Sequence, residues 1–189
     1  MRKFLLLRYS MVFTGFQTLD DRNNPEYFEV NGPHRCTSPK SWLGFGYYFW
    51  ESEIKWAHTW GKSLYRQYMI FECKIKYDET VFDIYGNPLH RKCIWGWMEE
   101  MKNKNPKIDE DELTIFNIIE YAKKYGKFER AYNAIRAADY PYAQKEVRFV
   151  PTRNEITYLG EERVQYCLIN KNNLILPSYM VIYPIKYKL

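Results

Sequence analysis

The sequence predicts an α+β fold: a single domain over residues 1–189 in which strands near both ends enclose a helical insertion. Three observations predict it. Apolar, β-prone segments occur early and late in the chain, helical periodicity fills the stretch from about 93 to 140, and the sequence has no internal repeats. Because strands and helices are segregated instead of alternating, a doubly wound parallel sheet is disfavoured.

The N-terminal part of the chain predicts one strand and a long connection. Residues 4–13 are apolar and β-prone, and Gly15 marks the end of this strand. Residues 17–42 are rich in Asp, Asn, Pro and Ser, which predicts a loop with at most one short element.

A ring-rich segment and a short helix follow. Residues 44–50 read GFGYYFW, and we expect a helix from Glu53 to about Trp60. Ser52 is the expected N-cap and Gly61 the expected residue after the helix, since these residue types favour those positions.

Residues 68–76 alternate between apolar and polar side chains, which predicts a half-buried strand. Residues 80–84 predict another strand or a continuation of this one. The side chains on the apolar face of the first of these strands are Met69, Phe71, Cys73 and Ile75.

The predicted helical insertion covers residues 93–140. Leu113, Phe116, Ile119 and Lys123 follow helical spacing, and the polar, proline-containing stretch 103–112 separates two helical segments. After the insertion, three further strands are expected at 146–150, 163–169 and 179–185.

Aromatic content is the outlier of the composition. Tyr, Phe and Trp make up 19% of the residues, whereas 46% hydrophobic and 27% charged residues are ordinary values for a soluble protein. Aromatic rings bury large areas, and they also stack on nucleobases and nicotinamide. The net charge of +5 mildly favours an anionic ligand, although the basic residues are scattered.

The cysteines and the start of the chain exclude several classes of protein. The four cysteines form no CxxC pair and only three histidines accompany them, which argues against a zinc site and a disulfide scaffold. The start MRKFLLLRYSMVF is interrupted by Arg8 and lacks a small-residue cleavage site, so a strand is predicted there and not a signal peptide. No apolar stretch approaches the roughly 18 residues of a membrane span. We therefore expect a cytoplasmic protein without a membrane partner.

Familiar nucleophile and phosphate motifs such as GxSxG, GxxxxGK[ST] and HExxH are absent. Three short segments carry the remaining signal, namely MVFTGF at 11–16, GFGYYF at 44–49 and ERVQYCLIN at 162–170. In the last segment, Gln165 is an amide on an otherwise apolar strand face. Such a group either faces solvent or has a specific hydrogen-bond partner.

In this order the three segments resemble the ADP-ribosyltransferase fold family. That family carries a His-Gly or Arg-Gly pair on a first strand, a G-x-G-x-Y-F strand followed by a helix containing Ala, and a last strand that starts with a catalytic Glu. Gly44, Gly46, Tyr48 and Phe49 match the second element, and Ala57 follows nine residues after Tyr48. The segment is also similar to the GxGxYFWE stretch of uncharacterised bacterial proteins with this fold. The resemblance covers residues 11–61 and 144–176, and it implies a split antiparallel β-sheet core.

The resemblance also implies roles for individual residues around NAD, which would be the substrate, with no metal. The Gly15 backbone would pair with the nicotinamide carboxamide, Thr14 would contact a ribose hydroxyl, Tyr48 would stack on the nicotinamide and Gln165 would orient the ribose. The expected catalytic residues are therefore Thr14, Tyr48 and Gln165. The expected cofactor-binding residues are Thr14, Gly15, Phe16, Gly46, Tyr48, Phe49 and Trp56.

Two residues depart from the family pattern. Thr14 replaces the His or Arg, and Gln165 stands where the best-studied members have Glu. A Glu there stabilises the oxocarbenium-like charge as nicotinamide leaves, whereas a neutral Gln supplies no charge. Glu51 and Glu155 are carboxylates that could compensate. Arg148 and Arg153 could meet the NAD pyrophosphate.

Several hypotheses stay open on this basis. The first is an NAD-dependent ADP-ribosyltransferase or NAD glycohydrolase, acting as a toxin or phage-defence effector on a protein or nucleic-acid acceptor, with an antitoxin as partner. The second is a catalytically silent domain that binds NAD, ADP-ribose or nucleic acid. The third is a protein-interaction domain. Trp56 and Trp60 either form a wall of the site or pack on the sheet, and His58 is a base in the site or an ordinary surface or core histidine.

Overall fold

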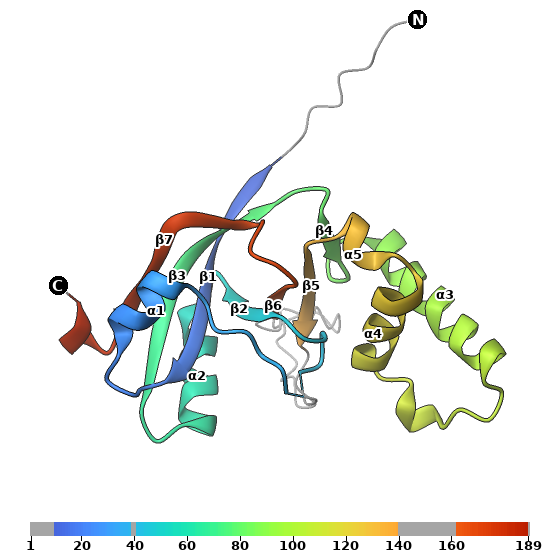
Figure 1. Ribbon diagram of the computed structural model, residues 1–189, viewed down its shortest axis with the longest axis horizontal. Helices are drawn as coiled ribbons and strands as arrows, with labels where there is room; N and C mark the ends of the chain where they lie inside the picture. The colour runs from blue at the N-terminus through green and yellow to red at the C-terminus, as the bar shows by residue number, and fades with distance from the viewer. Residues whose placement is uncertain (1–9, 39–40, 140–161, 189) are drawn as a thin grey trace, which may run out of the picture.

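The computed structural model describes residues 10–38, 41–139 and 162–188 and has a mixed α+β architecture (Figure 1). Its open sheet has the strand order β4-β5-β6-β2-β1-β3-β7, and all neighbouring strands are antiparallel except β4 and β5. The strands are β1 Met11–Asp20, β2 Tyr47–Glu51, β3 Tyr68–Tyr77, β4 Val81–Asp83, β5 Ala134–Asp139, β6 Arg163–Leu168 and β7 Leu174–Tyr183. The helices are α1 Pro25–Asn31, α2 Ile54–Leu64, α3 Pro88–Lys104, α4 Ile115–Tyr125 and α5 Phe128–Ala131, with short 3-10 turns at Glu110–Glu112 and Ile185–Tyr187.

Strand β3 confirms the strand that alternation predicts for residues 68–76. The side chains of its apolar face are fully buried, whereas Glu72 and Lys74 point to the other face. The strand expected at 80–84 is also present, as the short β4. The alternation of apolar and polar side chains therefore correctly predicts β3, the strand that lies between β1 and β7.

Strand β1 differs from its prediction because it runs on to Asp20, so Gly15 lies in its middle. The polar residues after Gly15 are held in the strand by pairing with β3, from Gly15 opposite Cys73 to Asp20 opposite Tyr68. Helix α1 is the one short element expected within residues 17–42. Residues 4–9 lie outside the described residues.

Helix α2 starts and ends later than its sequence signals predict. Glu53 is the N-cap, and Ser52 has a left-handed φ of 59°. Gly61 lies inside the helix, where an added Cβ would stand 2.5 Å from the Tyr68 ring. Gly61 is therefore needed for the close approach of α2 to β3 and does not end the helix.

The helical insertion ends earlier than predicted. Helices α3, α4 and α5 occupy residues 88–131, but Ala134–Asp139 forms β5, between β4 and β6. Its sequence AIRAAD has no strand-like alternation, so tertiary pairing and not local pattern makes it a strand. The strand expected at 146–150 lies outside the described residues.

The two faces of the sheet pack differently. The core face, which carries Phe49, Phe71 and Tyr166, forms one buried cluster to which the edge strands β4 and β7 both contribute. The helix face, which carries Phe16, Trp50 and Cys167, is covered by α2 over β1, β2 and β3 and by the helical insertion over β4, β5 and β6. In Figure 1, α2 lies beside β1 and β3, and helices α3 to α5 lie beside β4 and β5.

A buried ion network ties three strands together on the core face. Arg136 of β5 donates two hydrogen bonds to Glu51 of β2, at 2.6 and 2.7 Å, and its Nη1 lies 3.1 Å from Asp83 Oδ2 of β4. The three side chains are only 11%, 10% and 2% exposed. Asp83 also accepts a hydrogen bond from Tyr77 Oη at 2.9 Å. The network therefore joins strands from distant parts of the sequence.

We predict that Arg136→Met lowers the free energy of unfolding by about 3–5 kcal/mol, because it leaves two carboxylates buried without their cation. Chemical denaturation measures this change. The matched control is Lys104→Met, which breaks the exposed pair between Lys104 and Glu100 and should cost at most about 1 kcal/mol. Equal losses in the two variants would show that the network does not hold the sheet together.

A second prediction concerns the turn between β3 and β4. Burial alone raises the pKa of Asp78, but hydrogen bonds from Lys76 and Thr80 outweigh it and lower the pKa from 3.8 to about 2. Because the folded pKa is the lower one, the stabilisation of about 2 kcal/mol is complete well above pH 4 and is lost as the pH falls to about 2. Urea unfolding between pH 7 and pH 2 should therefore show a shallower pH dependence for Asp78→Asn than for the exposed control Asp111→Asn. Identical profiles would contradict this assignment.

Candidate functional site

The three segments that carry the sequence signal become neighbours in the sheet. Strand β2 lies between β6 and β1, with Trp50 opposite Gln165 on one side and opposite Phe16 on the other. Residues far apart in the sequence thus form one row across three strands. The site described below is built on this row.

The predicted site residues divide between the two faces of these strands. Thr14, Phe16, Tyr48 and Gln165 lie on the helix face, because residues opposite one another in a ladder share a face and neighbours along a strand alternate. Phe49 points to the core face and is only 1% exposed. The structure therefore separates Phe49 from the other side chains of the expected site.

Tyr48 is held by its hydroxyl. Tyr48 Oη accepts a hydrogen bond from Leu43 N at 2.9 Å and donates one to Gly44 O at 2.8 Å. Burial raises the pKa of this hydroxyl far above its usual value. The hydroxyl therefore closes the loop before β2 and stays protonated, and the ring is what remains to contact a ligand.

Gly46 and Gly44 shape that loop. An added Cβ at Gly46 would lie 2.5 Å from Cys167 Sγ, and the backbone of Gly46 exchanges two hydrogen bonds with Cys36. Gly44 has a φ of 87°, which favours glycine. The two glycines allow the loop to approach β6 closely, and the amide groups of Gly46 are bound within the chain.

Thr14 and Gly15 are both engaged by neighbouring strands. Thr14 Oγ1 accepts a hydrogen bond from Lys74 Nζ at 2.8 Å, and Thr14 O accepts one from Ser52 N at 2.7 Å. Alternate residues of an antiparallel strand direct their amides to opposite edges, so Gly15 directs its own toward Cys73 of β3. Contact between the Gly15 backbone and a nicotinamide carboxamide would require these groups to leave the ladder.

Gln165 has the specific partner that a buried amide needs. It is 6% exposed, and its Oε1 accepts a hydrogen bond from Trp42 Nε1 at 2.7 Å. This hydrogen bond uses the amide oxygen, so the amide nitrogen is the donor through which Gln165 would contact a ligand oxygen.

A tryptophan cluster surrounds this strand end. It comprises four of the six tryptophans of the chain: Trp42, Trp50, Trp56 and Trp60. The Arg163 guanidinium lies 5.7 Å from the ring centroid of Trp50 and 5.5 Å from that of Trp56, and it is ion-paired with Asp139. Trp60 packs edge-on against Trp50 at 6.1 Å. Both rings therefore pack on the sheet, and a role for them as a wall of a ligand site stays a prediction.

Two hydrogen-bond donors in the tryptophan cluster lack acceptors. Arg163 Nε and Trp56 Nε1 are buried, and neither has a partner among the residues that the structure describes. A buried donor without a partner costs about 1–3 kcal/mol. Two of them beside each other indicate that this place suits a ligand with oxygen acceptors.

Sequence reasoning missed Arg163, Asp139 and Lys74 as site residues. Arg163 precedes Gln165 by two residues, so the period of a strand already places both on one face. Lys74 similarly lies on the polar face of the predicted strand 68–76. Nothing in the local sequence connects Asp139 to Arg163, because their contact depends on the pairing of β5 with β6.

The remaining candidates lie elsewhere. Glu51 is on the core face with Arg136, so it cannot compensate for the missing carboxylate at Gln165. His58 Nδ1 is 3.0 Å from Tyr68 Oη, and its pKa is lowered by burial and by Lys62. Residues Arg148, Arg153 and Glu155 lie outside the described residues.

Two absences concern residues 10–38, 41–139 and 162–188, the ranges that the structure describes. In those ranges, no group of three or more His, Cys, Asp or Glu side chains could hold a metal ion. No helix there has the length and apolar character needed to cross a bilayer.

Comparisons with protein-family models, with curated proteins and with solved structures gave no match.

We predict that Tyr48→Phe lowers the free energy of unfolding by about 1–3 kcal/mol, because the Leu43 amide and the Gly44 carbonyl each lose a partner. Tyr125→Phe is the control, since Tyr125 is 56% exposed and its hydroxyl has no hydrogen-bond partner among the described residues. Thermal and urea unfolding measure both variants. Equal stability of the two would contradict a role of the Tyr48 hydroxyl in holding the loop.

Proposed function

We propose that this chain binds NAD on the helix face, between α2 and the helical insertion, and cleaves the bond between nicotinamide and ribose. It would act as an ADP-ribosyltransferase or an NAD glycohydrolase, in a toxin or phage-defence role. The observation that carries the proposal is the adjacency of β6, β2 and β1, which brings Gln165, Tyr48 and Thr14 to one face. These are the residues to which the family resemblance assigns the reaction.

The tryptophan cluster supports a ligand that has both flat rings and anionic groups. Trp56 offers a ring beside the site, and aromatic stacking binds nucleobases and nicotinamide alike. Arg163 supplies a guanidinium that suits a pyrophosphate or a ribose hydroxyl. Arg163 Nε and Trp56 Nε1, which have no partner among the described residues, supply two hydrogen-bond donors for ligand oxygens.

The proposed reaction needs no group beyond NAD and an acceptor. The glycosidic C–N bond breaks, and nicotinamide leaves with the bonding electron pair. A hydroxyl of a protein or nucleic acid, or water, then bonds to the ribose carbon and releases a proton. Gln165 would orient the ribose through its amide nitrogen. It would not supply the negative charge that stabilises the oxocarbenium-like ion.

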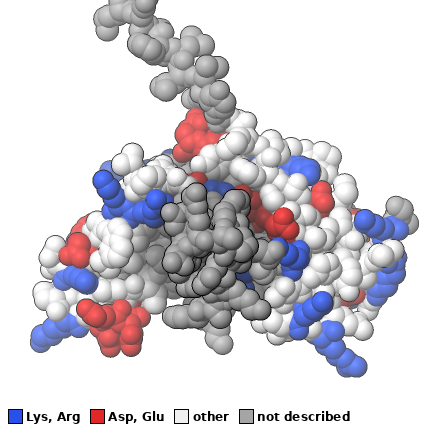
Figure 2. Space-filling model, turned by 180° about the vertical axis from the view of Figure 1, so that it is seen from behind, with Lys and Arg blue, Asp and Glu red and all other residues white. Residues whose placement is uncertain are grey.

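We also propose a protein or nucleic-acid acceptor for the ADP-ribose group and an antitoxin as a partner. Figure 2 shows Lys and Arg side chains in separate groups on the face it displays, with Asp and Glu among them. The basic groups on this face form no continuous stripe of the kind that nucleic-acid backbones favour.

A catalytically silent NAD-binding domain is the second candidate, and the hydrogen bonds of the site favour it. Gln165 is neutral and bound to Trp42, Thr14 is bound to Lys74, and Glu51 is on the other face. These contacts hold the site residues in place but leave the oxocarbenium-like ribose without a carboxylate partner at Gln165. Binding and cleavage must therefore be measured separately.

The test combines NAD titration by calorimetry with chromatographic measurement of nicotinamide release. We expect wild-type binding and slow release, and faster release for Gln165→Glu, which keeps an acceptor for Trp42 and adds the missing charge. Tyr48→Ala should lose release. Trp56→Ala should weaken NAD binding about tenfold, the typical value of one stacked ring. Trp95→Ala is its control, because Trp95 is 63% exposed on α3.

Three outcomes separate the hypotheses. Release by the wild type that Gln165→Glu accelerates supports the enzyme. Binding without release in both proteins identifies the silent domain. No saturable NAD binding would refute both, and the protein-interaction domain would then be the remaining hypothesis.

A further inference from the structure

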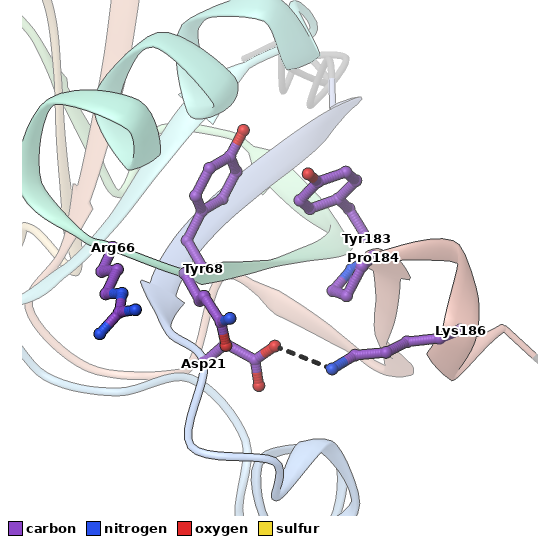
Figure 3. A pocket seen from close by; sticks show the side chains of 7 residues that line it. Asp21, Arg66, Tyr68, Tyr183, Pro184 and Lys186 are labelled. Atoms are coloured by element: carbon purple, nitrogen blue, oxygen red, sulfur yellow. Dashed lines mark ion pairs between the residues drawn. The ribbon is translucent and has the colours of Figure 1, made fainter.

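A second concave site lies at the other end of the sheet, where β3 begins and β7 ends (Figure 3). It has a volume of about 250 Å³ and is lined on one side by the stacked rings of Tyr68 and Tyr183, whose centroids are 5.0 Å apart. None of the residues that line it is among those proposed to bind NAD. The pocket is therefore distinct from the site proposed for NAD.

The pocket exists because β7 leaves the sheet early. The pairing of β3 with β7 ends at Ile70 opposite Tyr183, and the next residue, Pro184, has no N–H to continue it. On the edge of β3 that faces β1, Asp21 N donates a hydrogen bond to Gln67 O. Because successive residues of an antiparallel strand direct their backbone groups to opposite edges, the Tyr68 amide points to the other edge, beyond the end of β7. Tyr68 thus offers a backbone N–H without a strand partner.

Two cations border this amide. Arg66 is exposed and has no ion-pair or hydrogen-bond partner among the described residues. Lys186 Nζ is held 3.5 Å from Asp21 Oδ2 and lies over the Tyr187 ring at 4.6 Å. Figure 3 shows the two side chains approaching the pocket from opposite sides of Asp21.

Asp21 lines the pocket with a buried side chain and positions Lys186 through their ion pair. Its side chain is only 3% exposed. Its Oδ1 accepts hydrogen bonds from Asn23 N and Tyr187 Oη, both at 2.9 Å. These neutral donors hold the carboxylate in place and leave its charge unchanged, so Asp21, Arg66 and Lys186 together give the pocket one net positive charge.

We infer that this pocket binds the phosphate group of a small phosphate monoester. Arg66 and Lys186 would supply charge-assisted hydrogen bonds, and the Tyr68 amide would supply a third donor of fixed direction. A phosphate group offers three acceptor oxygens, one for each of these three donors, whereas a carboxylate offers only two. The inference does not rest on NAD binding, because it uses none of the residues proposed to bind NAD.

The experiment titrates the full chain with inorganic phosphate and with ribose 5-phosphate, following the backbone amide signal of Tyr68 by NMR at near-physiological salt. We expect saturable shifts of this signal. Arg66→Ala and Lys186→Ala should each weaken binding about tenfold, as the loss of one charge-assisted hydrogen bond predicts. The control is Lys107→Ala, which removes one exposed cation in the helical insertion.

The two ligands distinguish the source of the phosphate. Tighter binding of ribose 5-phosphate identifies a monoester as the ligand, and equal binding identifies the phosphate group alone as what is recognised. Equal affinity in the Arg66, Lys186 and Lys107 variants would overturn the inference, because it would reflect net charge alone. Absence of saturation would overturn it as well. Neither result depends on whether NAD is bound or cleaved.

Discussion

The contact on which the rest of this structure depends is the buried pairing of Arg136 with Glu51. A shift of one residue in a strand moves every side chain to the opposite face. By holding Glu51 on the core face, Arg136 also fixes Tyr48 and Trp50 on the helix face. A charge left unpaired in the core would be too costly for another register to compete. The ion pair therefore determines which side chains the candidate site contains.

The two faces of the sheet therefore carry different kinds of side chain. The core face carries the closely packed rings and the ion network, and it joins both edges of the sheet in one cluster. The helix face carries polar groups with partly satisfied hydrogen bonds, among them Gln165 and Arg163. The helix face also contributes buried apolar side chains, among them Cys167 and Trp50, so both faces stabilise the strands that carry Gln165.

The sequence predicted the features that depend on local pattern. Alternation located β3 and the apolar face of Met69 to Ile75, and the motif order pointed to the strands that became neighbours. It did not reveal β5, because AIRAAD lacks a strand period, nor the partners of Arg136 and Arg163, which lie on other strands. Tyr48 and Gln165 could be singled out from the sequence. Their hydrogen bonds to Gly44 and Trp42 depend on loop geometry that no spacing encodes.

The contact between Gly61 and the Tyr68 ring has a consequence for how this sequence can change. A Cβ at position 61 would lie 2.5 Å from the ring, so a larger residue there requires a smaller one at position 68. Positions that constrain each other in this way covary during evolution. Tyr68 is also part of the pocket that Arg66 and Lys186 border. A change at Gly61, a buried residue of α2, would therefore alter a surface pocket that Gly61 itself does not line.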